Sequence, residues 1–347
     1  MWRVRGKRTL ILMLLFFALT QLAFAQTGSA DEPLFEQLSE TFKKKYLSIG
    51  MLLQTVGDFQ IERNLAGNNG FNIANFRLSV SGELDDGFGY FLQTNFASSP
   101  SILDAKMSFK IASILNIDVG LFKAPFSKEF LTSAASIDFV NRSQVVSALT
   151  PGREIGVMLS GWFAPDVLSW SVGLFNGNQF GSNNNDNDNF LYVGRAAFFP
   201  QLPSRSENLE IGFNLGISED DNANLGSLDP SFEGMRFLIG GDARWTRDHL
   251  LVSGEVIYAS LDPEFGPTTH PFGFHATAGY MLNPKTQVLA RLDSFDPDGL
   301  QDDSHLIVLG LNHWPTQATE VQVNYVIPTE DGGIDHNQIL INAQVSF

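Results

Sequence analysis

The chain has 347 residues and no cysteine, which excludes disulfide frameworks, thiolate nucleophiles and cysteine-based zinc sites. Its formal net charge is −16 at pH 7. This acidity argues against nucleic acid as a partner, because proteins that bind nucleic acid neutralise phosphates with lysine and arginine.

The first 25 residues have the three parts of an export signal. Four basic residues precede an apolar stretch at 10–19, and Ala23-Phe24-Ala25 is a small-x-small cleavage site. The alternative, a membrane anchor, is disfavoured because a spanning helix needs roughly 20 apolar residues. Residues 1–25 are therefore predicted to be a signal peptide that is removed on export.

Residues 26–45 are predicted to form a short periplasmic segment with a helical pattern. Leu34, Leu38 and Phe42 recur at helical spacing, and three lysines follow at 43–45. Two roles stay open for this segment. It is either a small plug or oligomer contact, or simply the leader into the first strand.

From Tyr46 to Phe347 the hydrophobic pattern has a period of two, which is typical of β-strands. No long apolar run remains after the signal, so a membrane-spanning chain would have to form a closed barrel. Short turns alternate with long polar loops, as in an up-and-down barrel. The predicted strands lie near 46–56, 72–83, 88–97, 102–111, 115–123, 153–163, 167–176, 189–199, 208–217, 234–246, 249–259, 271–282, 285–295, 304–314, 319–327 and 337–347.

Charged residues in these segments fall almost entirely on one phase, and apolar residues fall on the other. A charge that faces lipid at the bilayer midplane costs about 2–4 kcal/mol, so the charged phase must face a lumen. We therefore predict an all-β fold, a transmembrane antiparallel up-and-down β-barrel over residues 46–347 with about 16 strands. Its basic pore-wall residues would be Arg77, Lys106, Lys110, Arg195, Arg236, Arg244 and Arg291.

Aromatic residues at strand ends predict two interfacial girdles. The periplasmic girdle would contain Phe163, Phe198, Phe199, Trp245, Tyr280, Trp314 and Phe347. The outer girdle would contain Phe96, Phe175, Tyr258 and Phe295. A terminal phenylalanine such as Phe347 also resembles the signal that barrel assembly machinery recognises.

The longest connection, residues 124–152, is long enough to suggest a functional loop, and we expect it to fold inward as a constriction. The family resemblance lies around this loop. Its motifs are Gly120-x-Phe122-Lys123-x-Pro125-Phe126-x-x-Glu129, Ser133, Asn141-Arg142-Ser143, Pro151-Gly152-Arg153-x-x-Gly156, Gly173-x-Phe175-Asn176-Gly177 and Gly194-Arg195-Ala196.

In these motifs the chain resembles the phosphate-selective porin O/P family. The resemblance implies a sixteen-stranded, trimeric outer-membrane channel that passes phosphate or pyrophosphate along basic pore residues. The matching basic residues at the constriction are Lys123, Lys128, Arg142 and Arg153. The chain departs from the family in its overall acidity and in having no dominant basic ladder on its strands.

Two roles are open for the four constriction cations. They either line the path of an anion, or pair with Glu129, Asp138 and Glu154 to hold the loop against the wall. The excess acids lie mainly in predicted external loops, so we expect local charge to favour anions at the constriction. These external acids are Asp186, Asp188, Glu219, Asp220, Asp221, Asp296, Asp298, Asp302, Asp303, Glu330 and Asp331.

The predicted function is a porin for small hydrophilic solutes and ions, with phosphate or other anions implied by the resemblance. One alternative is a plugged adhesin-like or structural barrel. Another is a hydrolase of the outer-membrane phospholipase type, for which His249 and His305 are candidates without a motif. We expect no enzymatic activity.

No cofactor or metal site is predicted. NNNDNDN (183–189) and DPDGLQDD (296–303) lack the full calcium-loop pattern and are solvated loops or weak divalent-ion sites. The expected partners are outer-membrane lipid and lipopolysaccharide, small anions or other hydrophilic solutes, the barrel assembly machinery and copies of the chain in a homotrimer. The expected location is the outer membrane of a Gram-negative cell.

Overall fold

The computed structural model describes residues 46–60, 69–84, 87–164, 166–179, 184–204, 206–226, 228–298, 303–330, 334 and 336–347. The predicted signal peptide and the helical pattern before residue 46 lie outside this range. In the described part of the chain, no helix combines the length and the apolar character needed to cross a membrane.

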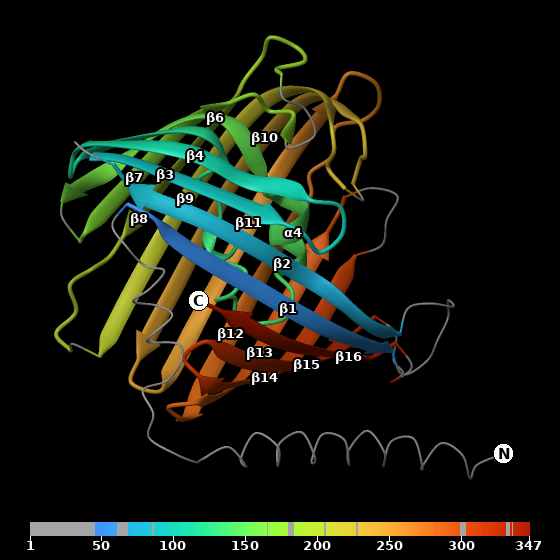
Figure 1. Ribbon diagram of the computed structural model, residues 1–347. Coiled ribbons are helices and arrows are strands. Elements are labelled where there is room, and N and C mark those ends of the chain that lie inside the picture. Colours follow the sequence, from blue (N-terminus) through green and yellow to red (C-terminus); the bar gives the residue numbers. More distant parts are fainter. Residues whose placement is uncertain are drawn as a thin grey trace. The chain divides into compact units, whose positions relative to one another are not determined.

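The described residues form sixteen strands that close into one antiparallel barrel (Figure 1). Each strand pairs with its neighbours in sequence, and β1 closes the ring on β16 with Leu53 opposite Val345. This confirms the predicted architecture. The strands are β1 (Ser48–Gln60), β2 (Gly70–Glu83), β3 (Phe88–Asn95), β4 (Ser101–Ala112), β5 (Leu115–Lys123), β6 (Arg153–Ala164), β7 (Leu168–Phe175), β8 (Leu191–Phe198), β9 (Glu207–Ala223), β10 (Phe232–Arg247), β11 (Leu250–Pro263), β12 (Phe272–Asn283), β13 (Thr286–Asp296), β14 (Ser304–Thr316), β15 (Thr319–Pro328) and β16 (Gln338–Ser346).

The barrel has its polar residues inside and its apolar residues outside. On β9, Phe213 is 53 % exposed on the outer face, whereas the next residue, Asn214, is fully buried in the lumen. Leu92, Met107 and Val252 are likewise exposed on the outer face of other strands. A water-soluble protein would have the opposite arrangement, so this surface suits a lipid environment.

Two aromatic residues that were predicted for the outer girdle face the lumen instead. Phe175 at the end of β7 is fully buried, and its ring contacts Phe122 at a centroid distance of 5.5 Å. Phe295 on β13 belongs to the same buried apolar cluster. Phe295 shares the phase of Arg291 and Asp293, and Phe175 shares the phase of the serines of β7. The phase, rather than the position at a strand end, therefore decides where an aromatic side chain points. Phe163, by contrast, is exposed on the outer face and stacks on Trp170.

The predicted external loop at 218–233 is shorter than expected, because β9 continues to Ala223 and β10 begins at Phe232. Asp220 was placed in that loop, and this placement is wrong. The alternation of β9 continues through Ser218 and Asp220, which both turn inward. The Asp220 carboxylate is buried 2.8 Å from Nε of Arg236 on β10.

Candidate functional site

The connection between β5 and β6 lies inside the barrel and contains two short helices, α3 (Lys128–Leu131) and α4 (Gln144–Leu149) (Figure 1). Phe126, Val145, Val146 and Leu149 are among its buried apolar residues. They pack on inward-facing apolar residues of the wall, which include Val193, Leu238, Ile257 and Phe295. Gly273 on β12 lets α4 approach closely, since a Cβ atom there would lie 2.8 Å from Cβ of Val145. This apolar contact fills one side of the lumen.

Ion pairs hold the acidic residues of the loop to the same side of the wall. Glu129 accepts hydrogen bonds from the backbone N–H and the hydroxyl of Ser143, and its carboxylate lies 3.3 Å from Nη1 of Arg291 on β13. Both oxygens of Asp138 bind the guanidinium of Arg244 on β10, at 2.6 and 3.0 Å. The Glu129–Arg291 pair is largely buried, and a buried charge needs such a partner, whereas the Asp138–Arg244 pair is partly exposed. Both pairs connect the loop to the wall.

Uncharged amide side chains hold the middle of the loop. The amides come from the adjacent strands β14, β15, β16 and β1, and they bind successive backbone groups of residues 134–140. The contacts of this amide strap are Gln54 Nε2 to Ala134 O (3.1 Å), Gln344 Nε2 to Ala135 O (2.9 Å), Gln322 Nε2 to Ile137 O (3.1 Å), Asn312 Nδ2 to Asp138 O (2.8 Å) and Val140 N to Asn324 Oδ1 (2.8 Å). The loop therefore crosses the lumen and is fixed at both sides.

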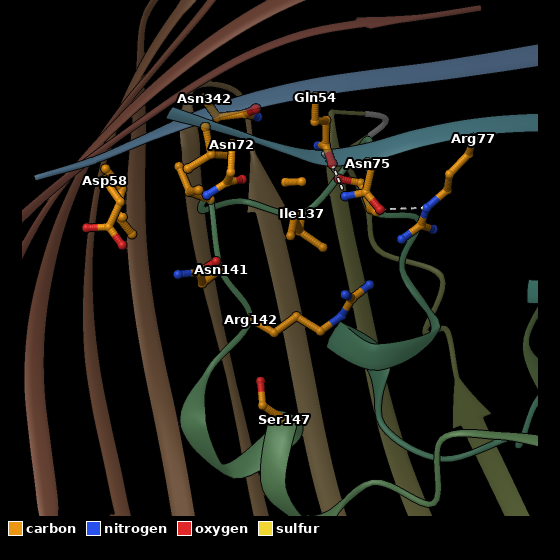
Figure 2. Close-up of a pocket in the computed structure, with 15 residues that line it drawn as sticks. Gln54, Asp58, Asn72, Asn75, Arg77, Ile137, Asn141, Arg142, Ser147 and Asn342 are labelled. Atoms are coloured by element: carbon orange, nitrogen blue, oxygen red, sulfur yellow. Dashed lines mark hydrogen bonds between the residues drawn. The ribbon is translucent and has the colours of Figure 1, made fainter. Parts of the chain in front are cut away.

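A cavity of about 400 Å³ remains between the loop and the strands β1, β2 and β16, and Figure 2 shows the side chains around it. Most of the polar residues along it are amides, and its charged residues are Asp58, Arg77 and Arg142. The guanidinium groups of Arg77, from β2, and Arg142, from the loop, point toward the same part of the cavity, while Asp58 lies at the other end (Figure 2). The lining residues are Gln54, Val56, Asp58, Asn72, Ala74, Asn75, Arg77, Ala134, Ile137, Val140, Asn141, Arg142, Ser147, Leu340 and Asn342.

Positive charge concentrates at one end of this passage. Arg77 and Arg142 interact electrostatically with each other and with Arg153, and Lys123 interacts with all three arginines. We call Arg77, Lys123, Arg142 and Arg153 the basic cluster. Asp104 is the carboxylate bound to it, with Oδ2 at 3.1 Å from Nη2 of Arg153.

The two loop-side cations of the cluster bind backbone carbonyls instead of carboxylates. Nζ of Lys123 lies 2.5, 3.4 and 3.0 Å from the carbonyl oxygens of Phe130, Leu131 and Thr132 at the end of α3. Arg142 donates from Nε to the Glu129 carbonyl (3.1 Å) and from Nη2 to the Thr132 carbonyl (2.8 Å). Burial lowers the pKa of the Arg142 guanidinium, Glu129 opposes this change, and Arg153 adds to it. Arginine stays protonated at neutral pH in such an environment.

Thus three of the four residues predicted for the constriction, Lys123, Arg142 and Arg153, lie together with the predicted wall residue Arg77. The fourth, Lys128, is bonded to Glu210 on β9 at 2.5 Å. The residues that the sequence reasoning missed are the amides of the strap and Asn75. These amides stand on the inward phase of their strands, and the alternation along each strand in the sequence could have identified them.

Most other predicted wall residues are engaged in ion pairs. Arg195, Arg236 and Arg291 are almost completely buried and pair with Asp242, Asp220 and Asp293 respectively. Lys106 lies 3.1 Å from Asp118, and Arg244 binds Asp138 as described above. Lys110 is exposed at the end of β4. These residues face inward, but the buried arginines have no surface to offer a solute.

The candidate histidines of a hydrolase lie on the outer face of the barrel. His305 Nδ1 is 2.8 Å from the Ser294 hydroxyl, which is the donor–acceptor contact that a nucleophilic serine needs. Glu330, however, binds the backbone N–H of His305 rather than its ring. The ring of His249 lies 5.9 Å from the ring of Tyr280, and the two rings are tilted by 47°. Among the described residues, no group of three or more His, Asp or Glu side chains is arranged to hold a metal ion.

Comparison with known proteins identifies the family. The family model described as phosphate-selective porin O and P matches residues 53–261, which is more than half of the chain. No curated protein matches the chain at a significant level.

Solved structures share the fold at low sequence identity. The anion-selective porin from Comamonas acidovorans is 11 % identical, with a TM-score of 0.66 over 88 % of this chain and 100 % of that chain. The trimer form of OmpT from Vibrio cholerae is 12 % identical, with a TM-score of 0.63 over 87 % of this chain and 99 % of that chain. OprB from Pseudomonas putida is 12 % identical, with a TM-score of 0.64 over 91 % of this chain and 96 % of that chain. The chain belongs to the phosphate-selective porin O and P family and is a passive channel of the outer membrane.

Proposed function

We propose that this porin favours small anions over cations at the passage between the loop and β1, β2 and β16. One observation carries the proposal. In the described structure the basic cluster has four cations and one bound carboxylate, Asp104, and its residues Arg77, Lys123 and Arg142 make no ion pair. The predicted role of Lys123, Arg142 and Arg153 in an anion path, and of Arg77 in the pore wall, is part of this proposal.

Distance from the passage determines whether the basic cluster or the acidic surface of the protein sets the ion preference. Exposed loop acids such as Asp186, Asp298 and Glu330 are screened beyond roughly 8 Å at physiological salt. A cation about 5 Å from a passing anion contributes about 3 kcal/mol at an effective dielectric constant near 20. The local charge at the narrow passage therefore outweighs the net charge of the chain.

The reversal potential in a KCl gradient across a planar bilayer tests this proposal. The wild-type channel should favour chloride. The variant Arg142→Glu should shift the reversal potential toward potassium while the channel still conducts, because it replaces a cation at the passage by an anion. A wild-type channel that strongly favours potassium would refute the proposal.

We also propose that the chain is exported by cleavage after Ala25, assembled through its terminal Phe347 and active as a homotrimer among outer-membrane lipid and lipopolysaccharide. The OmpT structure from Vibrio cholerae is described as a trimer form, which supports the proposed homotrimer. Phe347 exchanges backbone hydrogen bonds with Met51 at the barrel seam, both 3.1 Å long, which supports a role in closure. N-terminal sequencing should begin at Gln26, and native mass measurement in detergent should give three chains per particle.

The last part of the proposal is that the channel has no hydrolase activity. Among the described residues, no carboxylate binds the ring of His305 at its contact with Ser294. The strands that carry these two residues, β13 and β14, use their backbone N–H groups in the sheet. Purified protein should therefore not hydrolyse phospholipid. Phospholipid hydrolysis that disappears in Ser294→Ala would contradict this part.

A further inference from the structure

The cavity beside the loop has two ends of opposite charge. Arg77 and Arg142 lie at one end, and Asp58 lies at the other (Figure 2). The cavity volume of about 400 Å³ falls in the range of small-molecule sites in proteins, about 300–1,000 Å³. The end that contains Asp58, which we call the Asp58 end, is separate from the basic cluster, and its groups suit a different class of solute.

The strand register places Asp58 beside Asn72. Asp58 on β1 pairs with Gly70 of β2, and Val56, two residues earlier on β1, pairs with Asn72. Asp58 and Asn72 are therefore diagonal neighbours, at a spacing of about 7–8 Å that one small solute can bridge. Gly70 has no side chain to cover Asp58, and a Cβ atom built there would have no other atom within 4 Å. The Asp58 carboxylate is thus open to the cavity.

Asn141 completes the Asp58 end from the side of the loop (Figure 2). The backbone around it is held to the wall at two points. The N–H of Val140 donates to Oδ1 of Asn324 at 2.8 Å, and the carbonyl of Asn141 accepts from Nη1 of Arg291 at 3.2 Å. The Asn141 side chain therefore extends into the cavity from a fixed segment, and such preorganisation reduces the entropy lost when a solute binds.

The polar groups of the Asp58 end are available to a solute. Oδ1 of Asp58 accepts from Nε2 of Gln338 at 2.6 Å, whereas no described residue bonds its Oδ2 or forms an ion pair with its carboxylate. Asn72 and Asn141 are both exposed, and their side-chain amides make no hydrogen bond with the described part of the chain. One carboxylate oxygen and two complete amide groups thus face the same space.

The other amides of the cavity are bonded to the protein instead. Asn75 donates to Oε1 of Gln54 and accepts from Nε of Arg77 at 2.8 Å (Figure 2). Asn342 donates to Oε1 of Gln322 at 3.0 Å. These residues shape the wall of the passage, and their donors are already in use.

The chemistry of the Asp58 end matches hydroxyl groups. A carboxylate only accepts hydrogen bonds, whereas an amide side chain donates and accepts, and a hydroxyl group does both. Val56 and Leu340, which pairs with Asp58, line the same part of the cavity and offer apolar atoms to the C–H groups of a solute. Asp58 repels an anion, and the basic cluster repels a cation. An uncharged solute with several hydroxyls is therefore the class that neither end opposes.

We propose that Asp58, Asn72 and Asn141 form a subsite that binds the hydroxyl groups of uncharged polyhydroxylated solutes, the class of sugars and sugar alcohols. The inference rests on the proposed use of this passage by solutes, but it does not depend on the preference for anions. It adds a second class of solute and the three residues that bind it.

Sorbitol block of the single-channel current in symmetric KCl tests the subsite. A solute that does not bind lowers the current only in proportion to the conductivity of the bulk solution. Sorbitol should lower it further, to a plateau as its concentration rises. Triethylene glycol dimethyl ether has oxygens that accept hydrogen bonds but no donor for Asp58, so its effect should follow the bulk conductivity.

Three variants assign the block to the subsite. Asp58→Asn, Asn72→Ala and Asn141→Ala should each raise the half-saturating concentration of sorbitol by about two- to ten-fold, the effect of one lost hydrogen bond. Asp58→Asn keeps the size of the side chain and an acceptor for Gln338. Gln201→Ala is the matched control, because it removes an exposed amide between β8 and β9 and should leave the block unchanged. The heat-modifiable folded fraction is measured for every variant.

The absence of a saturating sorbitol block, or equal half-saturating concentrations in Gln201→Ala and the three variants, would overturn the inference. Block by ethylammonium chloride without block by sorbitol would show that the Asp58 end takes cations, and would also overturn it. Sorbitol is uncharged, so its block is expected whatever the reversal potential in a KCl gradient. A preference for potassium would therefore defeat the proposed anion preference, whereas a preference for chloride without sorbitol block would defeat the subsite alone.

Discussion

The two sides of the lumen hold the inward loop by different means. Against β8 to β13 the loop packs with apolar residues such as Phe126 and with buried ion pairs such as that of Glu129 and Arg291. Against β14 to β16 and β1 it is held by the uncharged amide strap, and the open cavity lies beside this attachment. Ion pairing neutralises the charges on the filled side, whereas in the described structure Arg77 and Arg142 hydrogen-bond to amides and carbonyls and make no ion pair. The partner of an arginine, more than its location in the barrel, therefore decides whether it can serve a solute.

The largest effect should follow from breaking an ion pair on the filled side. Arg291→Met leaves Glu129 and Asp293 buried without their cation, and removing one partner of a buried pair costs about 3–5 kcal/mol. We expect the free energy of unfolding in urea to fall by this amount, and the single-channel conductance to rise as the loop detaches. Arg247→Gln is the control, because Arg247 is exposed and lies 4.0 Å from Asp248. Equal losses in the two variants would contradict the importance of the buried pair.

A bulkier residue at Gly310 should push the loop toward the passage. A Cβ atom at this position on β14 would lie 2.9 Å from the Phe139 ring. Overpacking of this kind costs about 1–3 kcal/mol. Gly310→Val should therefore lower the free energy of unfolding and the conductance together, whereas Arg291→Met should move conductance in the opposite direction. Gly194→Val is the control, since a Cβ there makes only ordinary contacts at 3.6 Å or more.

The amide strap should be individually weaker than the ion pairs. Gln322→Leu removes the donor to the carbonyl of Ile137 and the acceptor of the Asn342 amide, and should cost about 2 kcal/mol, at about 1 kcal/mol for each uncharged hydrogen bond. Because no charge is lost, the cost should be the same at low and high salt. Unfolding curves at the two salt concentrations measure it, and a strong salt dependence would argue against the uncharged attachment.

The smallest effect should come from the acid next to the passage. Asp104→Asn removes the carboxylate partner of Arg153 and increases the net positive charge of the basic cluster. We expect the anion-to-cation permeability ratio to rise by about two- to three-fold. The reversal potential in a KCl gradient measures this change. An unchanged reversal potential would mean that Asp104 does not influence the ion path.

The fold followed from the sequence because a lipid-facing wall imposes strict alternation on every strand. Each of the sixteen predicted segments overlaps a strand of the structure, including the short β3 and β8. The errors arose where alternation was set aside in favour of position. Phe175 and Phe295 were assigned to a girdle because they end strands, and Asp220 was assigned to a loop because its neighbours are polar. In each case the parity of the strand had already placed the residue inside.

The site was only partly predictable. The family motifs indicated Lys123, Arg142 and Arg153, but nothing in the sequence showed that Lys123 faces backbone carbonyls or that Arg153 faces Asp104. These contacts join residues that lie far apart along the chain or depend on the turn after α3. The amides that support Arg77 were overlooked because charged residues alone were considered as pore residues.

The claim that ions pass along the β1, β2 and β16 side, and not along the filled side, can be tested directly by thiol block of single cysteines. The chain has no cysteine of its own. Asn72 is exposed in the passage, and Thr277 is buried on the lumen face of β12. A charged methanethiosulfonate reagent should lower the single-channel current of Asn72→Cys and leave that of Thr277→Cys unchanged. Block of Thr277→Cys with no block of Asn72→Cys would contradict the account.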